Sequence, residues 1–166
     1  MDLKLADSGA TETLGLALAR SFPGAALGPA VVHLRGELGA GKTTCVRGLL
    51  RSLGVTGLVR SPTYTLVETY ALNGLTCVHI DLYRLQAAIE VDELGLRDYL
   101  GPGCLLLIEW PEKGAQALPA ADMDLALRYA GQGRSAQVSA KTTLGAEWLD
   151  NLGRDSRLAP YVTNLT

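Results

Sequence analysis

Eight residues, GELGAGKT at positions 36–43, restrict the fold of this chain more than any other feature of its sequence. They match the pattern G-x-x-x-x-G-K-[ST], in which glycines let consecutive backbone N–H groups turn inward and hold an anion. A β-prone run, AVVHLR at 30–35, precedes the motif, and a helical pattern over 42–53 follows it. A strand, a glycine-rich loop and a helix N-terminus in this order predict a loop that binds the phosphates of a nucleotide.

The last two residues of the motif carry the side chains that such a loop needs. We expect Lys42 to reach the β- and γ-phosphates and the Thr43 hydroxyl to bind Mg²⁺. A chance match to the motif has a probability on the order of 0.5% in a chain of average composition and this length. The chain has only four lysines against eleven arginines, so a lysine at the one required position favours the functional interpretation.

The rest of the chain predicts a single α/β domain with a mixed parallel and antiparallel sheet flanked by helices. Its 166 residues suffice for one domain, and 48% hydrophobic composition excludes disorder over most of the length. We expect a P-loop ATPase domain over 1–150 and a C-terminal tail over 151–166. The expected elements are helices at 11–20, 42–53 and 145–152, short helices within 86–100, strands at 30–35 and 104–108, and hairpins at 64–70/75–83 and 123–130/134–140.

Two carboxylates and one hydroxyl are candidates for the rest of the site. Glu109 ends the apolar run CLLLI and Asp81 ends CVHI, and ligands of open α/β sheets gather beyond the carboxyl ends of strands. We expect Glu109 at the metal and Asp81 at the hydrolytic step; the alternatives are solvated strand-end charges or, for Asp81, a helix N-cap. Thr63 follows Ser61-Pro62 and is either a residue that senses the γ-phosphate or part of a plain turn.

Five further residues have less specific interpretations. His33 and His79 lie inside predicted strands and are interpreted as core residues rather than ligands. Trp110 follows Glu109 and either packs on the nucleotide or a partner or is buried in the core. Arg84 and Arg134 are expected in mobile loops, where each either neutralises phosphate charge or faces solvent.

Charge and hydropathy exclude several classes of protein. The formal net charge is -2, so overall charge alone does not drive nucleic-acid binding, and a local basic patch is left open. No apolar run reaches the roughly 18 residues of a membrane span, and the N-terminus MDLKLADSGATE is polar and acidic where a secretory signal is basic and then apolar. Three widely spaced cysteines suit reduced thiols. We therefore expect a cytoplasmic protein that makes no contact with membranes.

Four segments together resemble one family. GELGAGKTT, SPTYTLVETY, HIDLYRL and LLIEWPEKG occur in this order, and over about residues 7–140 the chain is similar to the TsaE (YjeE) family. The resemblance implies a small α/β P-loop ATPase that binds ATP or ADP with Mg²⁺ and hydrolyses ATP slowly alone. It also implies the partners TsaB and TsaD, which transfer a threonylcarbamoyl group to adenosine 37 of tRNAs that read codons starting with A. Contact with tRNA is then indirect, through the complex.

The resemblance also assigns site residues. It places the metal at Thr43 and Glu109 and a site aspartate at Asp81. With the motif lysine and the threonine considered above, the predicted catalytic residues are Lys42, Asp81 and Thr63. This chain has Glu37 where the family often has Asp. The change is harmless, because this side chain does not need to touch phosphate. The predicted nucleotide contacts are Gly39, Ala40, Gly41, Lys42, Thr43 and Thr44 in the loop, Ser8 and Thr11 near the first helix, and Gly133 and Arg134 in a late turn.

Two other functions fit a phosphate loop. A free-standing small-molecule kinase transfers phosphate to a small acceptor without partners, and a nucleotide-dependent binding module barely turns over. The guanine-specificity element NKxD and the signature LSGGQ do not occur in the sequence, which disfavours a GTPase and an ABC-type ATPase. The four segments as a set favour the ATPase subunit.

Overall fold

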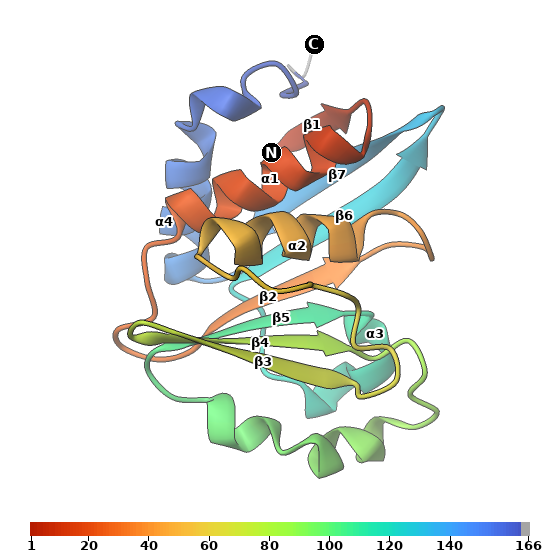
Figure 1. The fold of residues 1–166 in the computed structure, drawn as a ribbon, viewed down its shortest axis with the longest axis vertical. Coiled ribbons are helices and arrows are strands. Elements are labelled where there is room, and N and C mark those ends of the chain that lie inside the picture. The colour runs from red at the N-terminus through yellow and green to blue at the C-terminus, as the bar shows by residue number, and fades with distance from the viewer. Residues whose placement is uncertain (164–166) are drawn as a thin grey trace.

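The computed structural model describes residues 1–163, and a seven-stranded sheet with the order β1-β7-β6-β2-β5-β4-β3 runs through that part of the chain (Figure 1). The strands are β1 (Asp2–Leu5), β2 (Ala30–Arg35), β3 (Val67–Leu72), β4 (Leu75–Asp81), β5 (Cys104–Glu109), β6 (Met123–Ala130) and β7 (Gly133–Ala140). The α-helices are α1 (Ser8–Ser21), α2 (Lys42–Ser52), α3 (Pro111–Gly114) and α4 (Thr143–Gly153), and short 3-10 helices are η1 (Ala88–Leu94), η2 (Leu96–Tyr99), η3 (Ala115–Ala117) and η4 (Ser156–Leu158).

Parallel strands form the centre of the sheet. β2 pairs in parallel with β5 and β6, and β4 pairs in parallel with β5. The antiparallel strands β3, β7 and β1 complete the two sides. β2 and β5 are near-continuous apolar runs because helices or loops cover both of their faces. The predicted mixed α/β architecture is confirmed.

Alternate residues of the central strands pack into two apolar clusters, as the two-residue period of a strand requires. Val32 of β2 and Leu107 of β5 belong to the larger cluster, together with residues of α1, α2 and α4. Val31 and Leu106 belong to the smaller one, which η1 and η2 complete. In the larger cluster Trp148 of α4 is fully buried, and its indole N–H donates to the Leu18 carbonyl at 2.9 Å.

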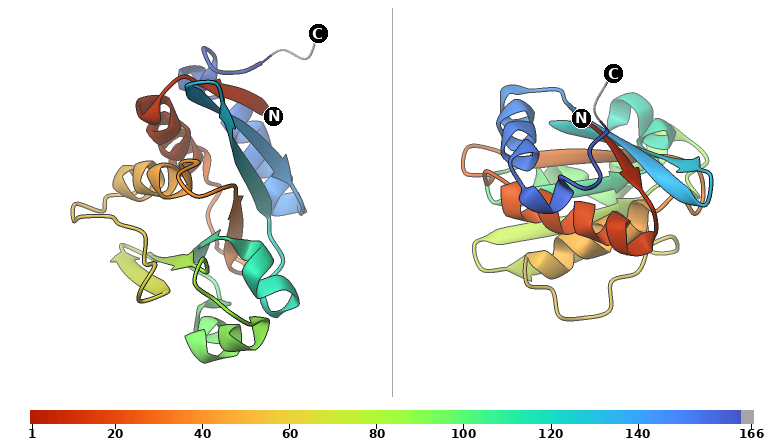
Figure 2. Two further views of the ribbon diagram at one scale, coloured as in Figure 1. Left: turned by 90° about the vertical axis from the view of Figure 1, so that its right-hand side faces the viewer. Right: turned by 90° about the horizontal axis from the view of Figure 1, so that it is seen from above.

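Helices α1 and α2 lie side by side in very close contact (Figures 1 and 2). A Cβ added at Gly15 would lie 2.0 Å from the Cys45 carbonyl oxygen, and one added at Gly48 would lie 2.3 Å from the carbonyl oxygen of Glu12. Only glycine permits backbones to approach so closely. The contact fixes the start of α1 beside the start of α2, where the phosphate loop ends.

The helices and both hairpins occur where the sequence predicts them, with differences at their ends. Helix α1 begins at Ser8 rather than at 11, because the Asp7 carboxylate caps it by accepting from the Ala10 N–H at 2.8 Å. Strand β3 begins at Val67 rather than at 64, since Leu66 adopts φ 62° in a turn that its N–H closes onto the Pro62 carbonyl at 2.6 Å. The structure adds β1, which the sequence analysis missed.

The segment predicted as a C-terminal tail packs on the domain as far as the structure describes it. Helix α4 extends to Gly153, past the expected boundary at 150, and Leu152 and Leu158 are buried in the larger cluster. The Lys4 N–H donates to the Tyr161 carbonyl at 2.8 Å. Residues 164–166 of the predicted tail lie outside the described residues, and the division at 150 stays a prediction.

Within residues 1–163, no helix is long and apolar enough to cross a bilayer. Cys45, Cys77 and Cys104 are free thiols. Burial raises the pKa of Cys45 to about 12 and that of Cys77 to about 12, so both stay protonated and unreactive.

The close helix contact predicts a large effect of a single methyl group. Gly48→Ala should lower the free energy of unfolding by roughly 1–3 kcal/mol, because α1 must move away from α2. Gly57→Ala is the control, since a Cβ there meets no atom within 4 Å. Urea denaturation of the two variants makes the comparison, and equal stability of both would contradict the account of the contact.

Candidate nucleotide-binding site

The glycine-rich loop joins β2 to α2 in a conformation that depends on three glycines. Gly36, Gly39 and Gly41 have φ of 139°, 75° and 107°. A Cβ at Gly36 would also lie 2.2 Å from the Leu127 carbonyl oxygen. Gly41 caps α2 in the left-handed conformation, so that the first turn of the helix directs its free N–H groups toward the loop. The loop thus has the backbone geometry of an anion-binding nest.

Lys42, the first residue of α2, lies inside the curve of this loop. Its ammonium group donates to the carbonyl oxygens of Gly36 at 2.7 Å and Glu37 at 3.0 Å. It also lies 3.9 Å from the ring centroid of Trp110, in a cation–π contact. Burial lowers the pKa of the Lys42 ammonium, while the nearby carboxylate of Glu109 opposes the shift. Lys42 is thus the buried charged side chain of the motif. Its ammonium group is held where phosphates would meet the loop.

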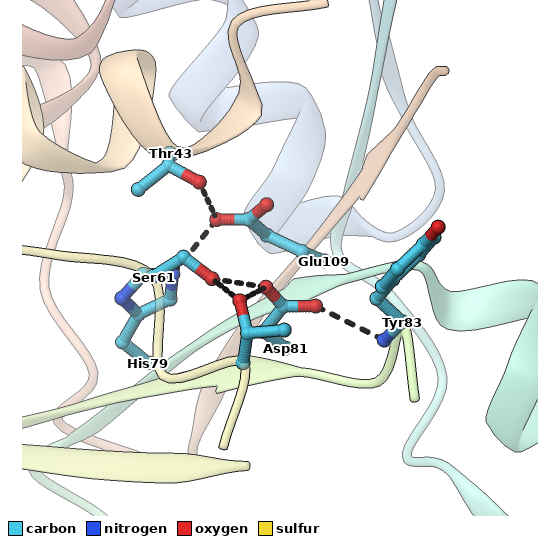
Figure 3. Close-up of polar contacts among 7 residues, drawn as sticks. Thr43, Ser61, His79, Asp81, Tyr83 and Glu109 are labelled. Atoms are coloured by element: carbon cyan, nitrogen blue, oxygen red, sulfur yellow. Dashed lines mark hydrogen bonds and ion pairs between the residues drawn. The ribbon is translucent and has the colours of Figure 1, made fainter. Parts of the chain in front are cut away.

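Glu109 connects the loop helix to the neighbouring strand. One of its carboxylate oxygens, Oε1, accepts from the Thr43 hydroxyl at 2.8 Å and lies 2.9 Å from Nε2 of His79 (Figure 3). Glu109 is only 2% exposed, and a buried carboxylate needs such donors. The structure thus brings Thr43 and Glu109, the two predicted metal ligands, into direct contact.

Asp81 ends β4 and holds the loop that precedes β3. Its Oδ2 accepts from the hydroxyls of Ser61 and Thr63, the latter at 3.1 Å, and these two hydroxyl oxygens lie 2.6 Å apart (Figure 3). Its Oδ1 accepts from the Tyr83 N–H at 3.0 Å in a turn, and not at a helix N-cap, the alternative considered for Asp81, because the next helix, η1, begins only at Ala88. Asp81 therefore holds the turn after β4 and also binds the predicted γ-phosphate sensor.

The predicted site residues line two pockets that share the glycine-rich loop. The first, of about 250 Å³, is lined by Gly39, Gly41, Lys42, Thr43, Thr44, Ser61, Thr63, Asp81 and Glu109, together with Leu38, Tyr83 and Trp110. The second, of about 300 Å³, is lined by Ser8, Thr11, Gly39, Gly41, Thr44, Gly133 and Arg134, together with Ala6, Asp7 and Gln132. Ala40 is fully buried beneath the loop and lines neither pocket.

The hairpin of β6 and β7 holds the tip of the loop. Arg134 donates to the Gly39 carbonyl at 3.1 Å and lies over the ring of Tyr129, whose hydroxyl donates to the Leu38 carbonyl at 2.8 Å. Arg134 therefore lies in strand β7 and not in the mobile loop expected for it, and its partner is the backbone of the phosphate loop. Arg84 lies over the ring of Tyr64, 4.4 Å from its centroid.

Sequence reasoning missed three residues of the site. His79 was expected in the core and is fully buried, yet it contacts Glu109; its position two residues before Asp81, on the same face of β4, was the available signal. Ser61 was visible only as a turn residue, and Tyr129 only as part of a strand. His33, the other histidine, lies 3.2 Å from the Pro119 carbonyl and fits the structural role expected of it.

Comparison with known proteins identifies the family. The family model described as "Threonylcarbamoyl adenosine biosynthesis protein TsaE" matches residues 5–137. This chain belongs to the TsaE family. Relatives named "tRNA threonylcarbamoyladenosine biosynthesis protein TsaE" include one from Haemophilus influenzae, 47% identical over 69% of this chain and 73% of the relative. Another, from Nostoc, is 36% identical over 81% of this chain and 83% of the relative.

A solved structure supports the same assignment. The crystal structure of YdiB from Bacillus subtilis superimposes with a TM-score of 0.76, 28% sequence identity and coverage of 93% of this chain and 94% of that one. TsaE is a family of P-loop NTPases. The fold of the TsaE-family chain described here is therefore a nucleotide-binding P-loop fold.

The position of Lys42 predicts the effect of its removal. Lys42→Ala should weaken ATP binding by about 10–100-fold, because charge-assisted hydrogen bonds are typically worth 1.5–3 kcal/mol. Isothermal titration with ATP measures the affinity, circular dichroism checks the fold, and Lys4→Ala on the exposed side of β1 is the control. Unchanged affinity in a folded Lys42→Ala protein would contradict the assignment of the loop.

Proposed function

We propose that this chain is the Mg²⁺-dependent ATPase subunit of an assembly, formed with TsaB and TsaD, that places threonylcarbamoyl on adenosine 37 of tRNAs reading codons that start with A. The observation that carries the proposal is that the lysine and threonine of the phosphate loop line one pocket with two strand-end carboxylates, in a chain of the TsaE family. The family favours this function over the small-molecule kinase and the binding module considered above.

The proposal includes no direct role in holding tRNA. With a formal net charge of -2, the chain lacks the overall basic character that proteins use to neutralise a nucleic-acid backbone. TsaB and TsaD would make the contacts with tRNA, and the assembly would work in the cytoplasm.

In the proposed complex, ATP or ADP occupies both pockets. The loop of residues 39–44 binds the phosphates through its N–H groups, and Lys42 compensates their charge. The nucleoside lies toward Ser8, Thr11 and the turn at Gly133-Arg134. Support comes from the residues that the two pockets share, Gly39, Gly41 and Thr44, which make the pockets neighbours on one loop.

The donor atoms beside the phosphate loop fit Mg²⁺. Thr43 and Glu109 supply hydroxyl and carboxylate oxygens, the ligands that a hard cation prefers. Oε1 of Glu109 accepts two hydrogen bonds, whereas Oε2 has no donor within residues 1–163. No three His, Cys, Asp or Glu side chains of the described residues gather into a metal cage, but Mg²⁺ at a nucleotide uses one or two protein oxygens, phosphates and water. Bound there, Mg²⁺ would neutralise charge on the phosphates.

The proposed hydrolytic step depends on Asp81 and the residues that it holds. Asp81 orients the attacking water, and Thr63 senses the γ-phosphate. The hydrogen bond of 3.1 Å between Thr63 and Asp81 supports a coupled role for the two residues. A movement of one side chain would change the position of the other. Ser61 belongs to the same group, since its hydroxyl contacts both.

We expect this step to be slow in the isolated chain. Fast P-loop enzymes use a glutamine that positions water or an arginine that stabilises the transition state. Within the described residues, neither a glutamine nor an arginine lines the first pocket. Partner proteins would have to supply the missing charge or order the loop around Thr63.

Steady-state phosphate release tests the proposed function. Adding TsaB and TsaD should accelerate ATP hydrolysis at least about tenfold, since charge supplied in trans is worth roughly 10³–10⁵ in GTPases. Thr63→Ala should reduce the accelerated rate more than the basal rate, and Thr63→Ser, which keeps the hydroxyl, should restore it. Thr65→Ala, in the same loop but exposed, is the control. An isolated chain that turns over as fast as the full assembly would contradict the proposal and favour the kinase.

A further inference from the structure

His79 is a buried polar residue to which the proposed mechanism gives no task. Its side chain is fully inaccessible, and Nε2 lies 2.9 Å from Oε1 of a carboxylate, Glu109, whose side chain is 3% exposed. Burying an imidazole beside a carboxylate costs free energy unless the two groups are paired. The pair is therefore a specific contact and not a consequence of general packing.

The parallel register of β4 and β5 creates this contact. Asp81 is the Cα partner of Glu109, and His79 lies two residues earlier on β4, so that it shares a face of the sheet with Asp81. That face is the one on which α2 lies, since Cys77 of the same alternation belongs to the cluster that contains α2 residues. In the view of Figure 3, Thr43 of α2 lies above Glu109 and His79 lies below it, and both side chains contact the Glu109 carboxylate.

The hydrogen bonds assign the proton of His79 to Nε2. The other ring nitrogen, Nδ1, is buried and has no hydrogen-bond partner within residues 1–163. An N–H at Nδ1 would be a buried donor without an acceptor, which costs more than an unshared lone pair at the same place. His79 therefore donates to Glu109, as Thr43 does.

We propose that His79 is a positioning residue for Glu109, which it orients so that the second carboxylate oxygen, Oε2, faces a divalent cation at the nucleotide. The two donors, Thr43 at 2.8 Å and His79 at 2.9 Å, engage the same atom, Oε1, and together fix the plane of the carboxylate. Hydrogen bonds of this kind to metal ligands typically govern metal affinity by about 10–100-fold. The inference rests on the proposed function, because it requires the cation that the function includes.

The test measures binding of Mn²⁺ in the presence of ADP, through the loss of the free Mn²⁺ signal in electron paramagnetic resonance. His79→Leu removes the donor and should weaken Mn²⁺ binding about 10–100-fold, while ADP affinity measured in EDTA falls much less. His79→Gln should restore Mn²⁺ binding to within a few-fold of the parent, because its amide nitrogen is as many bonds from Cβ as Nε2 of histidine.

Two controls separate positioning from packing. His33→Leu removes a buried histidine of β2 whose partner is the Pro119 carbonyl, and it should leave Mn²⁺ affinity unchanged. In a Glu109→Ala background, His79→Leu should have almost no further effect, since residues that act through one another are not additive. If His79→Leu does not fold, His79→Asn replaces it, because its amide is one carbon too short to donate to Glu109.

The outcomes distinguish this inference from the proposed function. If the parent binds neither ADP nor Mn²⁺ with ADP, the proposed function itself fails. If the parent binds both, parental Mn²⁺ affinity in His79→Leu or His79→Asn overturns the role of His79 alone. Equal weakening in His79→Gln and the variants without the donor also overturns it, because the effect would then not depend on the hydrogen bond.

Discussion

Parallel hydrogen bonding between β2, β5 and β4 places the carboxyl ends of three strands at one edge of the sheet. Leu34 and Asp81 are both Cα partners of Glu109, so the phosphate loop after β2 and the two acids cannot lie far apart. Because side chains alternate between the two faces of a strand, a shift of one residue in β5 would turn Glu109 to the opposite face and exchange the residues of the two apolar clusters. Burial of apolar side chains therefore fixes the positions of the polar atoms in the site.

The two sides of the phosphate loop are held by different interactions. On the side of α1, the glycine contact between the backbones of α1 and α2 leaves little space for movement. On the other side, side-chain hydrogen bonds to Asp81 hold Ser61 and Thr63. Such bonds exchange with other partners more easily than close backbone packing rearranges. This asymmetry agrees with a proposed nucleotide site that is preformed and a hydrolytic step that depends on partner proteins.

The sequence predicts the parts of the molecule whose signals are local. The glycine-rich loop, the buried strand that ends at Glu109 and the hairpin at Asn73-Gly74 each depend on neighbouring residues, and all three occur in the structure. Strand β1 could not be predicted, because its four residues form a strand only through β7, more than a hundred residues away. The contact of His79 with Glu109 requires the register of β4 on β5, which no short segment specifies.

The central claim is that the glycine-rich loop, Thr43 and Glu109 form one site for a nucleotide and its cation. A crystal structure of the chain with Mn²⁺ and a non-hydrolysable ATP analogue tests it most directly, since the anomalous scattering of Mn²⁺ locates the cation independently of the nucleotide. We expect the β-phosphate within the loop of residues 39–44 and the Mn²⁺ peak beside the Thr43 hydroxyl, on the side of Glu109. A nucleotide bound elsewhere, or a cation remote from both side chains, would contradict the account.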